Sequence, residues 1–277
     1  MRIVVFSRDR PMQLHACLRS FAMHCDDPSG HDVRVVYKPT TREIDRDYGD
    51  AMLDVMRTTS LALTSHFEHV FEEQTRALLA DANGCVCFVV DDTIFARAFS
   101  LADAAAALAD NDDAIGYSMR LGYNIERTYP GARATTKPVL WASDYGLSWD
   151  WRGADGDWGY PLEVSSSVYR VSDVVAWLYG LRFANPNVLE VCLDAAGARD
   201  PRDKLMSPPV SVAFSVPCNR VQTTFANRVG TNPQLSADAM LGLWRDGYQI
   251  DVAALAGHTP SAPHEEVPLV FCKRPTF

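Results

Sequence analysis

Basic residues are few in this chain and nowhere clustered. Its 277 residues include 26 Lys and Arg against 35 Asp and Glu, which gives a formal net charge of −9. No run of Lys or Arg is longer than a pair. Because phosphate backbones are bound by clustered Lys and Arg, this composition argues against a nucleic-acid partner.

Long apolar runs are also missing. No segment approaches the roughly 20 apolar residues that a membrane span needs. The N-terminal strand becomes charged at Arg8, too early for a signal peptide. The seven cysteines are scattered and odd in number, and Cys85 and Cys87 lack the two-residue spacer of a zinc knuckle or redox pair. We therefore expect a cytoplasmic protein with reduced thiols and no membrane span.

What is present is an alternation of strand and helix patterns. Apolar strands are expected at 2–6, 32–37, 86–90 and 114–119. The helices expected between them begin at Pro11, after Thr40 or Thr41, near 67 and after Ser100. This order predicts an α/β fold whose mostly parallel sheet carries helices on its faces. After residue 120 the periodicity weakens, and further helices are expected only at 172–181, 188–196 and 236–247.

Two adjacent carboxylates end the most apolar of these strands. The strand at 86–90 runs directly into Asp91 and Asp92. Buried carboxylates are costly unless a positive group meets them, and ligands of open α/β sheets bind at the carboxyl ends of the strands. A divalent cation that also neutralises a diphosphate would satisfy both conditions. The alternative is a turn whose aspartates face water or cap the next helix.

The order of these features resembles the nucleotide-sugar-dependent glycosyltransferases of the GT-A fold, specifically bacterial enzymes distantly like family 2. The matching segments are VVFSRDRP at 4–11, VVYK at 35–38, FVVDDTIF at 88–95, YSMRLG at 117–122, DWGYP at 157–161 and FANPNVLE at 183–190. The resemblance spans most of the chain and implies a GT-A-like, Rossmann-like α/β fold with helices on both faces of the sheet. We find no internal repeat or linker. One domain is therefore expected over 1–277, with a nucleotide-sugar-binding half at 1–120 and, at 121–277, an aromatic-rich acceptor-binding half that includes the C-terminal tail.

The same resemblance implies a metal site. Asp92 would ligate Mn²⁺ or Mg²⁺, while Asp91 would approach the ribose or the surroundings of the metal. The usual Asp-x-Asp motif is here Asp-Asp followed by Thr93, which leaves room for a single protein carboxylate on the metal or for weak metal dependence. His258 is a candidate further ligand, because late histidines bind the metal in some related folds. A haloacid-dehalogenase phosphatase would need Asp-x-Asp with Thr two places later, and that spacing is absent.

The resemblance also implies the groups that hold the nucleotide sugar. Arg8 or Arg10 would donate hydrogen bonds to base or phosphate, Lys38 would contact base or ribose, and Arg120 would clamp the sugar or phosphate. The plain alternative for Arg8, Arg10 and Lys38 is that they are solvated surface residues. The full set expected to bind the nucleotide sugar is Ser7, Arg8, Asp9, Arg10, Lys38, Asp91, Arg120 and Arg220.

Aromatic and acidic residues in the second half suggest an acceptor site. Aromatic faces stack on sugars, so Trp151, Trp158 and Tyr160 are expected to bind the acceptor, although buried tryptophans often serve only as core anchors. An inverting transfer needs a carboxylate base that takes the acceptor proton. Asp157 lies in a glycine- and aromatic-rich loop. Glu190 is expected in the first turn of a helix, where the helix dipole favours its charged form.

The function implied is that of a metal-dependent glycosyltransferase of hexosyltransferase type. It would move a sugar from a nucleoside diphosphate sugar to a glycan or lipid-linked acceptor, as in polysaccharide biosynthesis, and a lipid-linked acceptor leaves room for peripheral membrane contact. One alternative is a sugar-phosphate nucleotidyltransferase, although the loop at 7–11 lacks the glycines usual in that class. A second alternative is a non-catalytic nucleotide- or glycan-binding module of the same fold.

Overall fold

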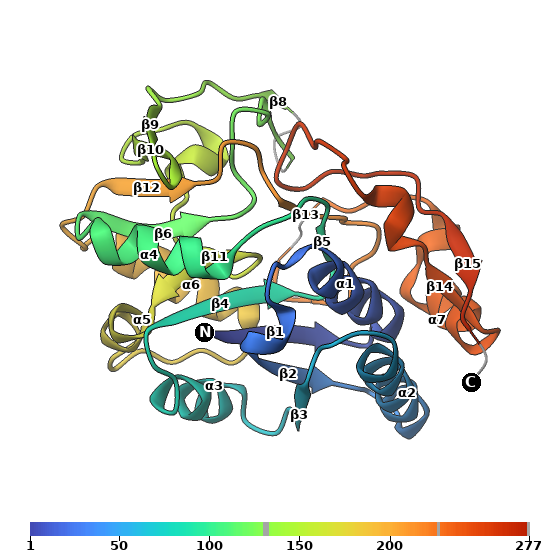
Figure 1. The fold of residues 1–277 in the computed structure, drawn as a ribbon. Coiled ribbons are helices and arrows are strands. Elements are labelled where there is room, and N and C mark those ends of the chain that lie inside the picture. Colours follow the sequence, from blue (N-terminus) through green and yellow to red (C-terminus); the bar gives the residue numbers. More distant parts are fainter. Residues whose placement is uncertain (130–132, 226–227, 276–277) are drawn as a thin grey trace.

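The structure is a computed structural model that describes residues 1–129, 133–225 and 228–275. Its centre is a nine-stranded sheet, which Figure 1 shows as a ribbon. The strands follow one another across the sheet in the order β3 (Leu63–Phe67), β2 (Asp32–Lys38), β1 (Arg2–Arg8), β4 (Cys85–Val90), β11 (Ser167–Arg170), β6 (Ala114–Ser118), β12 (Lys204–Ser207), β10 (Gly146–Asp150) and β9 (Trp141–Ser143).

The first half of the chain forms the expected parallel sheet. β1 pairs in parallel with both β2 and β4, and β2 pairs in parallel with β3. Strand β3 differs from the expectation, because the helix predicted from 67 begins only with α3 (Phe71–Ala80). β3 lies at the edge of the sheet, and its residues Thr64, Ser65 and His66 are polar. It therefore has no apolar run that would predict a strand.

The second half makes the sheet mixed. β11 lies between β4 and β6 and is antiparallel to both. β10 is antiparallel to β12 and β9, whereas β12 is parallel to β6. The predicted α/β class is confirmed, and the sheet is largely parallel only in the part built by the first half.

Helices cover both faces of the sheet, as expected. One apolar cluster packs α1 (Pro11–His24), α2 (Arg42–Thr58) and α4 (Leu101–Asp110) on one face. The other cluster packs α3, α5 (Val171–Trp177) and α6 (Pro186–Gly197) on the opposite face. Successive residues of β1 explain this arrangement, because Val5 joins the first cluster and Phe6 the second.

A third apolar cluster places the C-terminal region beside α1. It includes α7 (Ala237–Arg245) and β14 (Tyr248–Ile250), and Figure 1 shows these elements together with β15 (Phe271–Lys273) at one side of the molecule. The small pair β5 (Thr93–Phe95) and β13 (Ala213–Ser215) leads into this region. The remaining short elements are β7 (Arg127–Thr128), β8 (Arg133–Ala134), η1 (Pro28–Gly30), η2 (Gly156–Gly159), η3 (Pro233–Leu235) and η4 (Val252–Leu255).

Pairing around Ser215 brings late segments of the chain to the end of β4. Val216 N–H donates to the Asp92 carbonyl at 2.8 Å, while Ser215 N–H donates to the Pro263 carbonyl at 2.9 Å. The segment after residue 216 and the segment around His264 therefore lie next to the two aspartates. Among the helices of the described residues, none has the length and apolar character needed to cross a membrane.

Candidate active site

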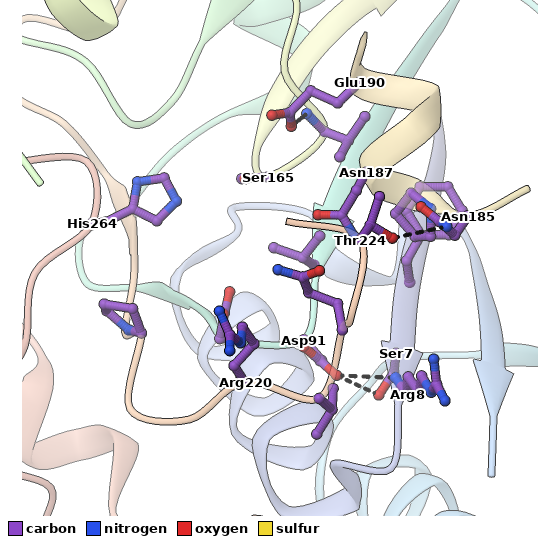
Figure 2. Close-up of a pocket in the computed structure, with 18 of the residues that line it drawn as sticks. Ser7, Arg8, Asp91, Ser165, Asn185, Asn187, Glu190, Arg220, Thr224 and His264 are labelled. Carbon is purple, nitrogen blue, oxygen red and sulfur yellow. Dashed lines mark hydrogen bonds between the residues drawn. The ribbon is translucent and has the colours of Figure 1, made fainter. Parts of the chain in front are cut away.

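A cleft of about 630 Å³ opens where the parallel strands end. Figure 2 shows residues from distant parts of the sequence around it, from Ser7 and Asp91 to Glu190 and His264. Most of the predicted site residues line this one cleft. They are Ser7, Arg8, Arg10, Lys38, Asp91, Asp92, Arg120, Asp157, Tyr160, Glu190 and Arg220.

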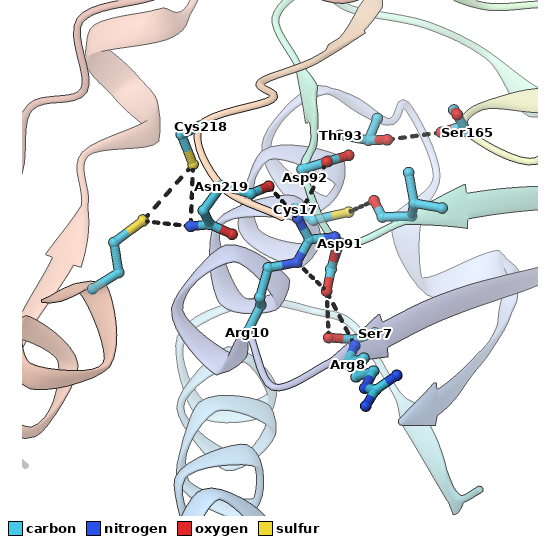
Figure 3. A network of polar contacts seen from close by, with 12 residues as sticks. Ser7, Arg8, Arg10, Cys17, Asp91, Asp92, Thr93, Ser165, Cys218 and Asn219 are labelled. Carbon is cyan, nitrogen blue, oxygen red and sulfur yellow. Dashed lines mark hydrogen bonds and ion pairs between the residues drawn. The ribbon is translucent and has the colours of Figure 1, made fainter. Parts of the chain in front are cut away.

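Asp91 is held by the last two residues of β1 and by Arg10. Its carboxylate accepts hydrogen bonds from Ser7 Oγ at 2.7 Å, Arg8 N–H at 3.3 Å and Arg10 Nε at 3.1 Å (Figure 3). Its side chain is only 1% exposed. Burial raises the pKa of Asp91 to about 6 against the opposing effect of Arg10. Asp91 therefore fixes the end of β1 and orients Arg10.

Asp92 is in a different environment. Its side chain is 17% exposed in the cleft, and its Oδ2 lies 3.4 Å from Arg10 Nη1. Burial lowers the pKa of Arg10, but the charges of Asp91 and Asp92 outweigh burial and leave that pKa raised. The Arg10 guanidinium thus offsets part of the negative charge of both aspartates. Asp92 is the more accessible of the two to a ligand in the cleft.

His264 supplies a second candidate metal ligand. It lines the same cleft, and its Nδ1 is buried without a hydrogen-bond partner among the described residues. Burial and the charge of Arg120 lower the pKa of His264, while Asp157 and Asp92 oppose this shift. A neutral imidazole and a carboxylate are suitable ligands for a divalent metal. Asp92 and His264 therefore fit a metal that takes its other ligands from phosphate and water.

The expected ligand His258 lies elsewhere. Its Nε2 contacts Glu265 Oε1 at 2.9 Å, and it is not among the cleft-lining residues. Sequence spacing does not separate His258 from His264, because only the pairing of the C-terminal segment with Ser215 directs His264 inward. In the part of the chain that the structure describes, no group of three or more His, Cys, Asp or Glu side chains could hold a metal.

Arg120 forms a buried charge cluster on another wall of the cleft. Its Nη2 lies 3.6 Å from Asp157 Oδ1, and its Nε lies 3.7 Å from Glu163 Oε1. Burial lowers the pKa of Arg120, but these carboxylates, together with Glu190, outweigh burial and leave it raised. Asp157 is therefore an ion-pair partner of Arg120, which makes it a weaker candidate for the base.

Glu190 is the carboxylate best suited to proton transfer. It accepts hydrogen bonds from Val164 N–H and from the Tyr160 hydroxyl, each at 3.1 Å. Burial, reinforced by the charge of Glu163, raises the pKa of Glu190 to about 7. Glu190 is the fifth residue of α6 and lies beyond its first turn. The expectation that it lies in the first turn, where the helix dipole would favour its charged form, is therefore wrong.

The two tryptophans expected at the acceptor site are not part of the cleft lining. Trp158 is fully buried and packs edge-on against Trp149, with ring centroids 5.0 Å apart. Trp151 is 8% exposed and is covered by the guanidinium of Arg152. Their large apolar surfaces serve the core on this face of the sheet. Of the three expected acceptor-binding aromatics, only Tyr160 lines the cleft.

Asp9 also lies outside the cleft lining. Its Oδ1 accepts a hydrogen bond from Thr40 N–H at 2.7 Å, so it ties the loop after β1 to the loop after β2. The cleft includes further residues that the sequence reasoning did not single out as ligands; Asn185 and Asn187 lie in the matching segment at 183–190, and the others lie outside the matching segments. These further residues are Glu68, Thr128, Tyr129, Ser165, Asn185, Asn187, Thr224, Arg228 and His264.

The chain is similar in sequence to a known glycosyltransferase. It is 24% identical over 260 residues to the bifunctional glycosyltransferase pgtA of Dictyostelium discoideum, covering 83% of this chain and 33% of that protein. The chain thus spans about a third of the length of this curated relative. No family model matches the chain. The predicted resemblance to glycosyltransferases is confirmed at this level of distant similarity.

Two kinds of solved structure are also similar to this chain. S. aureus TarS in complex with UDP-GlcNAc is 15% identical, with a TM-score of 0.45 over 74% of this chain and 56% of that chain. The mannosyltransferase PcManGT from Pyrobaculum calidifontis, in complex with GDP-Man and Mn²⁺, is 16% identical, with a TM-score of 0.47 over 78% of this chain and 57% of that chain.

Proposed function

We propose that this chain is a glycosyltransferase that moves a sugar from a nucleoside diphosphate sugar to a hydroxyl group of a glycan or lipid-linked acceptor. The observation that carries this proposal is the composition of one cleft. Arginines suited to a diphosphate and Glu190, with a pKa of about 7, lie on its walls. The sequence similarity to a glycosyltransferase supports the same reaction class.

The donor would be held through its phosphates. Arg10, Arg120, Arg220 and Arg228 all line the cleft. When the bond from the sugar to the diphosphate breaks, negative charge grows on the leaving phosphate oxygens. Cations already in position stabilise that charge without reorganisation, which is the largest contribution to many enzymatic rate enhancements. Asp91 supports this function indirectly, because it orients Arg10.

Mn²⁺ or Mg²⁺ would be held by Asp92 and His264 in this proposal. When bound, such an ion acts as a Lewis acid on the leaving diphosphate. Asp92 and His264 would contribute a carboxylate that is 17% exposed and an imidazole whose buried Nδ1 has no hydrogen-bond partner among the described residues, from two segments that meet beside Ser215. The ion would also offset the repulsion between Asp92 and the phosphates.

Glu190 would act as the general base. Its carboxylate takes the proton of the acceptor hydroxyl as the acceptor oxygen forms its bond to the anomeric carbon. The bond from that carbon to the diphosphate breaks, and its electron pair leaves with the nucleoside diphosphate. A base with a pKa near 7 is well matched to this transfer at neutral pH. Asp157 would act as a positioning residue that holds Arg120. A direct transfer of this kind inverts the configuration of the sugar.

A product assay tests the reaction class. The purified chain is incubated with UDP-, GDP-, dTDP- and CDP-sugars with and without Mn²⁺, and released nucleoside diphosphate is measured. We expect release from at least one donor, accelerated by an acceptor glycan. A nucleotidyltransferase would instead release pyrophosphate from a nucleoside triphosphate and a sugar phosphate. Release of pyrophosphate, or release of neither pyrophosphate nor nucleoside diphosphate, would overturn the proposed function.

A further inference from the structure

A lysine and a glutamate form one end of the cleft. Lys38 ends β2 and Glu68 follows β3, whose register pairs Tyr37 with Phe67 and so sets Lys38 and Glu68 next to each other. Lys38 Nζ lies 2.6 Å from Glu68 Oε1. The Glu68 side chain is 9% exposed, whereas that of Lys38 is 44% exposed, and both line the cleft.

The negative charge of Glu68 makes it unsuitable as a phosphate contact. A carboxylate repels a diphosphate, which the arginines of the cleft can hold instead; one of them, Arg8, is paired with Lys38 in the register of β1 and β2. Phe6 of β1 and Val36 of β2 also line the cleft, and the register of the two strands pairs them two residues before Lys38. Apolar side chains next to a polar pair suit a flat heterocycle whose edge forms hydrogen bonds. The Lys38–Glu68 pair and these apolar neighbours therefore have the character that a nucleobase site requires.

We propose that Lys38 and Glu68 select guanine, so that the donor is a GDP-sugar. This inference rests on the proposed function, which supplies the nucleoside diphosphate. The edge of guanine carries the O6 acceptor beside two donors, N1–H and the N2 amino group. A carboxylate accepts from both donors, and the Lys38 ammonium donates to O6. The negative charge of Glu68 thus faces the two donors of guanine, and the positive charge of Lys38 faces its acceptor.

Other bases match the pair less well. Adenine and cytosine place a ring acceptor where Glu68 needs a donor. Uracil offers N3–H, but its O2 acceptor faces the second carboxylate oxygen. A polar site that hydrogen-bonds one ligand rejects an analogue that leaves its groups unpaired or opposed. One bidentate pair discriminates between bases by about tenfold or more.

Calorimetric titration of the full chain tests the selection with GDP, IDP, UDP and ADP in the presence of Mn²⁺. IDP is the matched probe, because it differs from GDP only by the missing N2 amino group. We expect GDP to bind roughly tenfold or more tightly than IDP and UDP. This comparison needs no variant, so it stands even where a substitution affects folding.

Glu68→Gln provides the second arm. A glutamine amide accepts from N3–H of uracil and donates to its O2, so this variant should lose the preference for GDP over IDP and gain affinity for UDP. Glu73→Gln, an exposed carboxylate on α3 outside the cleft lining, should behave like the unmodified chain. Melting temperatures of both variants check that they are folded.

The outcomes separate this inference from the proposed function. If UDP binds at least as tightly as GDP, or Glu68→Gln leaves the ratio of the two affinities unchanged, guanine selection is overturned and the glycosyltransferase proposal stands. If no nucleoside diphosphate binds with or without Mn²⁺, both fall.

Discussion

At the scale of single residues, two neighbouring aspartates differ because their surroundings differ. Asp91 is 1% exposed and accepts hydrogen bonds from Ser7 and Arg8 at the end of β1 and from Arg10, whereas Asp92 is 17% exposed in the cleft. The sequence showed that both end a buried strand, but not which of them faces a ligand. That distinction depends on Arg10, which returns from the start of α1 to pair with Asp91.

The two aspartates should therefore respond differently to the same substitution. Asp91→Asn leaves the Arg10 charge poorly compensated, so we expect it to lower the free energy of unfolding by about 3 kcal/mol. Asp92→Asn should change stability little and abolish the Mn²⁺-dependent part of nucleotide binding. Urea unfolding and calorimetry measure the two effects. Equal loss of stability in both variants would contradict this division.

The pKa of Glu190 predicts a pH dependence. As a base it must be ionised, so turnover should rise as the pH increases through about 7. Glu190→Gln should reduce turnover by about 10²–10⁴-fold and leave donor binding intact. Asp157→Asn is the comparison, because loss of a partner of Arg120 should weaken donor binding yet retain the rise near pH 7. If the rise in turnover near pH 7 persists in Glu190→Gln and disappears in Asp157→Asn, the base is Asp157 and not Glu190.

The raised pKa of Glu190 also predicts the direction in which stability changes with pH. The pKa in the folded state, about 7, lies above the ordinary value of 4.5, so the folded chain retains a proton that the unfolded chain releases. The stability that this group contributes is complete below about pH 4.5 and is lost as the pH rises to about 7. Glu190→Gln remains neutral throughout, and its melting temperature should therefore decrease less over this range. A parallel decrease in both proteins would contradict the assigned pKa.

At the scale of elements, caps and strand ends were predictable because their signals are local. Thr41 and Ser100 each accept a hydrogen bond from a backbone N–H in the first turn of a helix, as the helix starts expected there indicated, and Asn185 does the same for α6. Strand β3 and the strands β9 to β12 of the central sheet were not predicted, because they are too short, at three to five residues, for a local signal. Tertiary pairing, with β11 inserted between β4 and β6, determines them instead.

Asn185 links a helix cap to the site. Its Oδ1 accepts from Val188 N–H at 3.0 Å, and its Nδ2 donates to Thr224 Oγ1 at 3.2 Å. Asn185→Ala should lower the free energy of unfolding by about 1 kcal/mol, because the cap is lost. Asn185→Ser keeps a capping oxygen and should retain most of that stability. Thermal unfolding compares them, and equal melting temperatures for the two variants would show that the cap contributes nothing.

At the scale of the whole molecule, the cleft needs both halves of the sequence. Asp91, Asp92 and Arg10 come from the first half, and Glu190 and His264 from the second. The order of motifs predicted the class of fold, and most of the predicted site residues line the cleft, although they are a minority of its lining. It could not predict that Trp158 is a core residue or that His264 lies in the cleft, because both depend on contacts between distant segments.

The shared sheet leads to a prediction about truncation. β11 lies between β4 and β6, so residues 1–120 alone would leave those two strands without the partner that joins them. Unpaired buried backbone groups and exposed apolar faces are both costly. We therefore expect the 1–120 fragment to show no cooperative thermal transition and no nucleotide binding, while the full chain shows both. Addition of a separately produced 121–277 fragment supplies β11 and should restore part of the transition. A 1–120 fragment that unfolds cooperatively and binds a nucleoside diphosphate by itself would show instead that the first half is an independent nucleotide-binding domain.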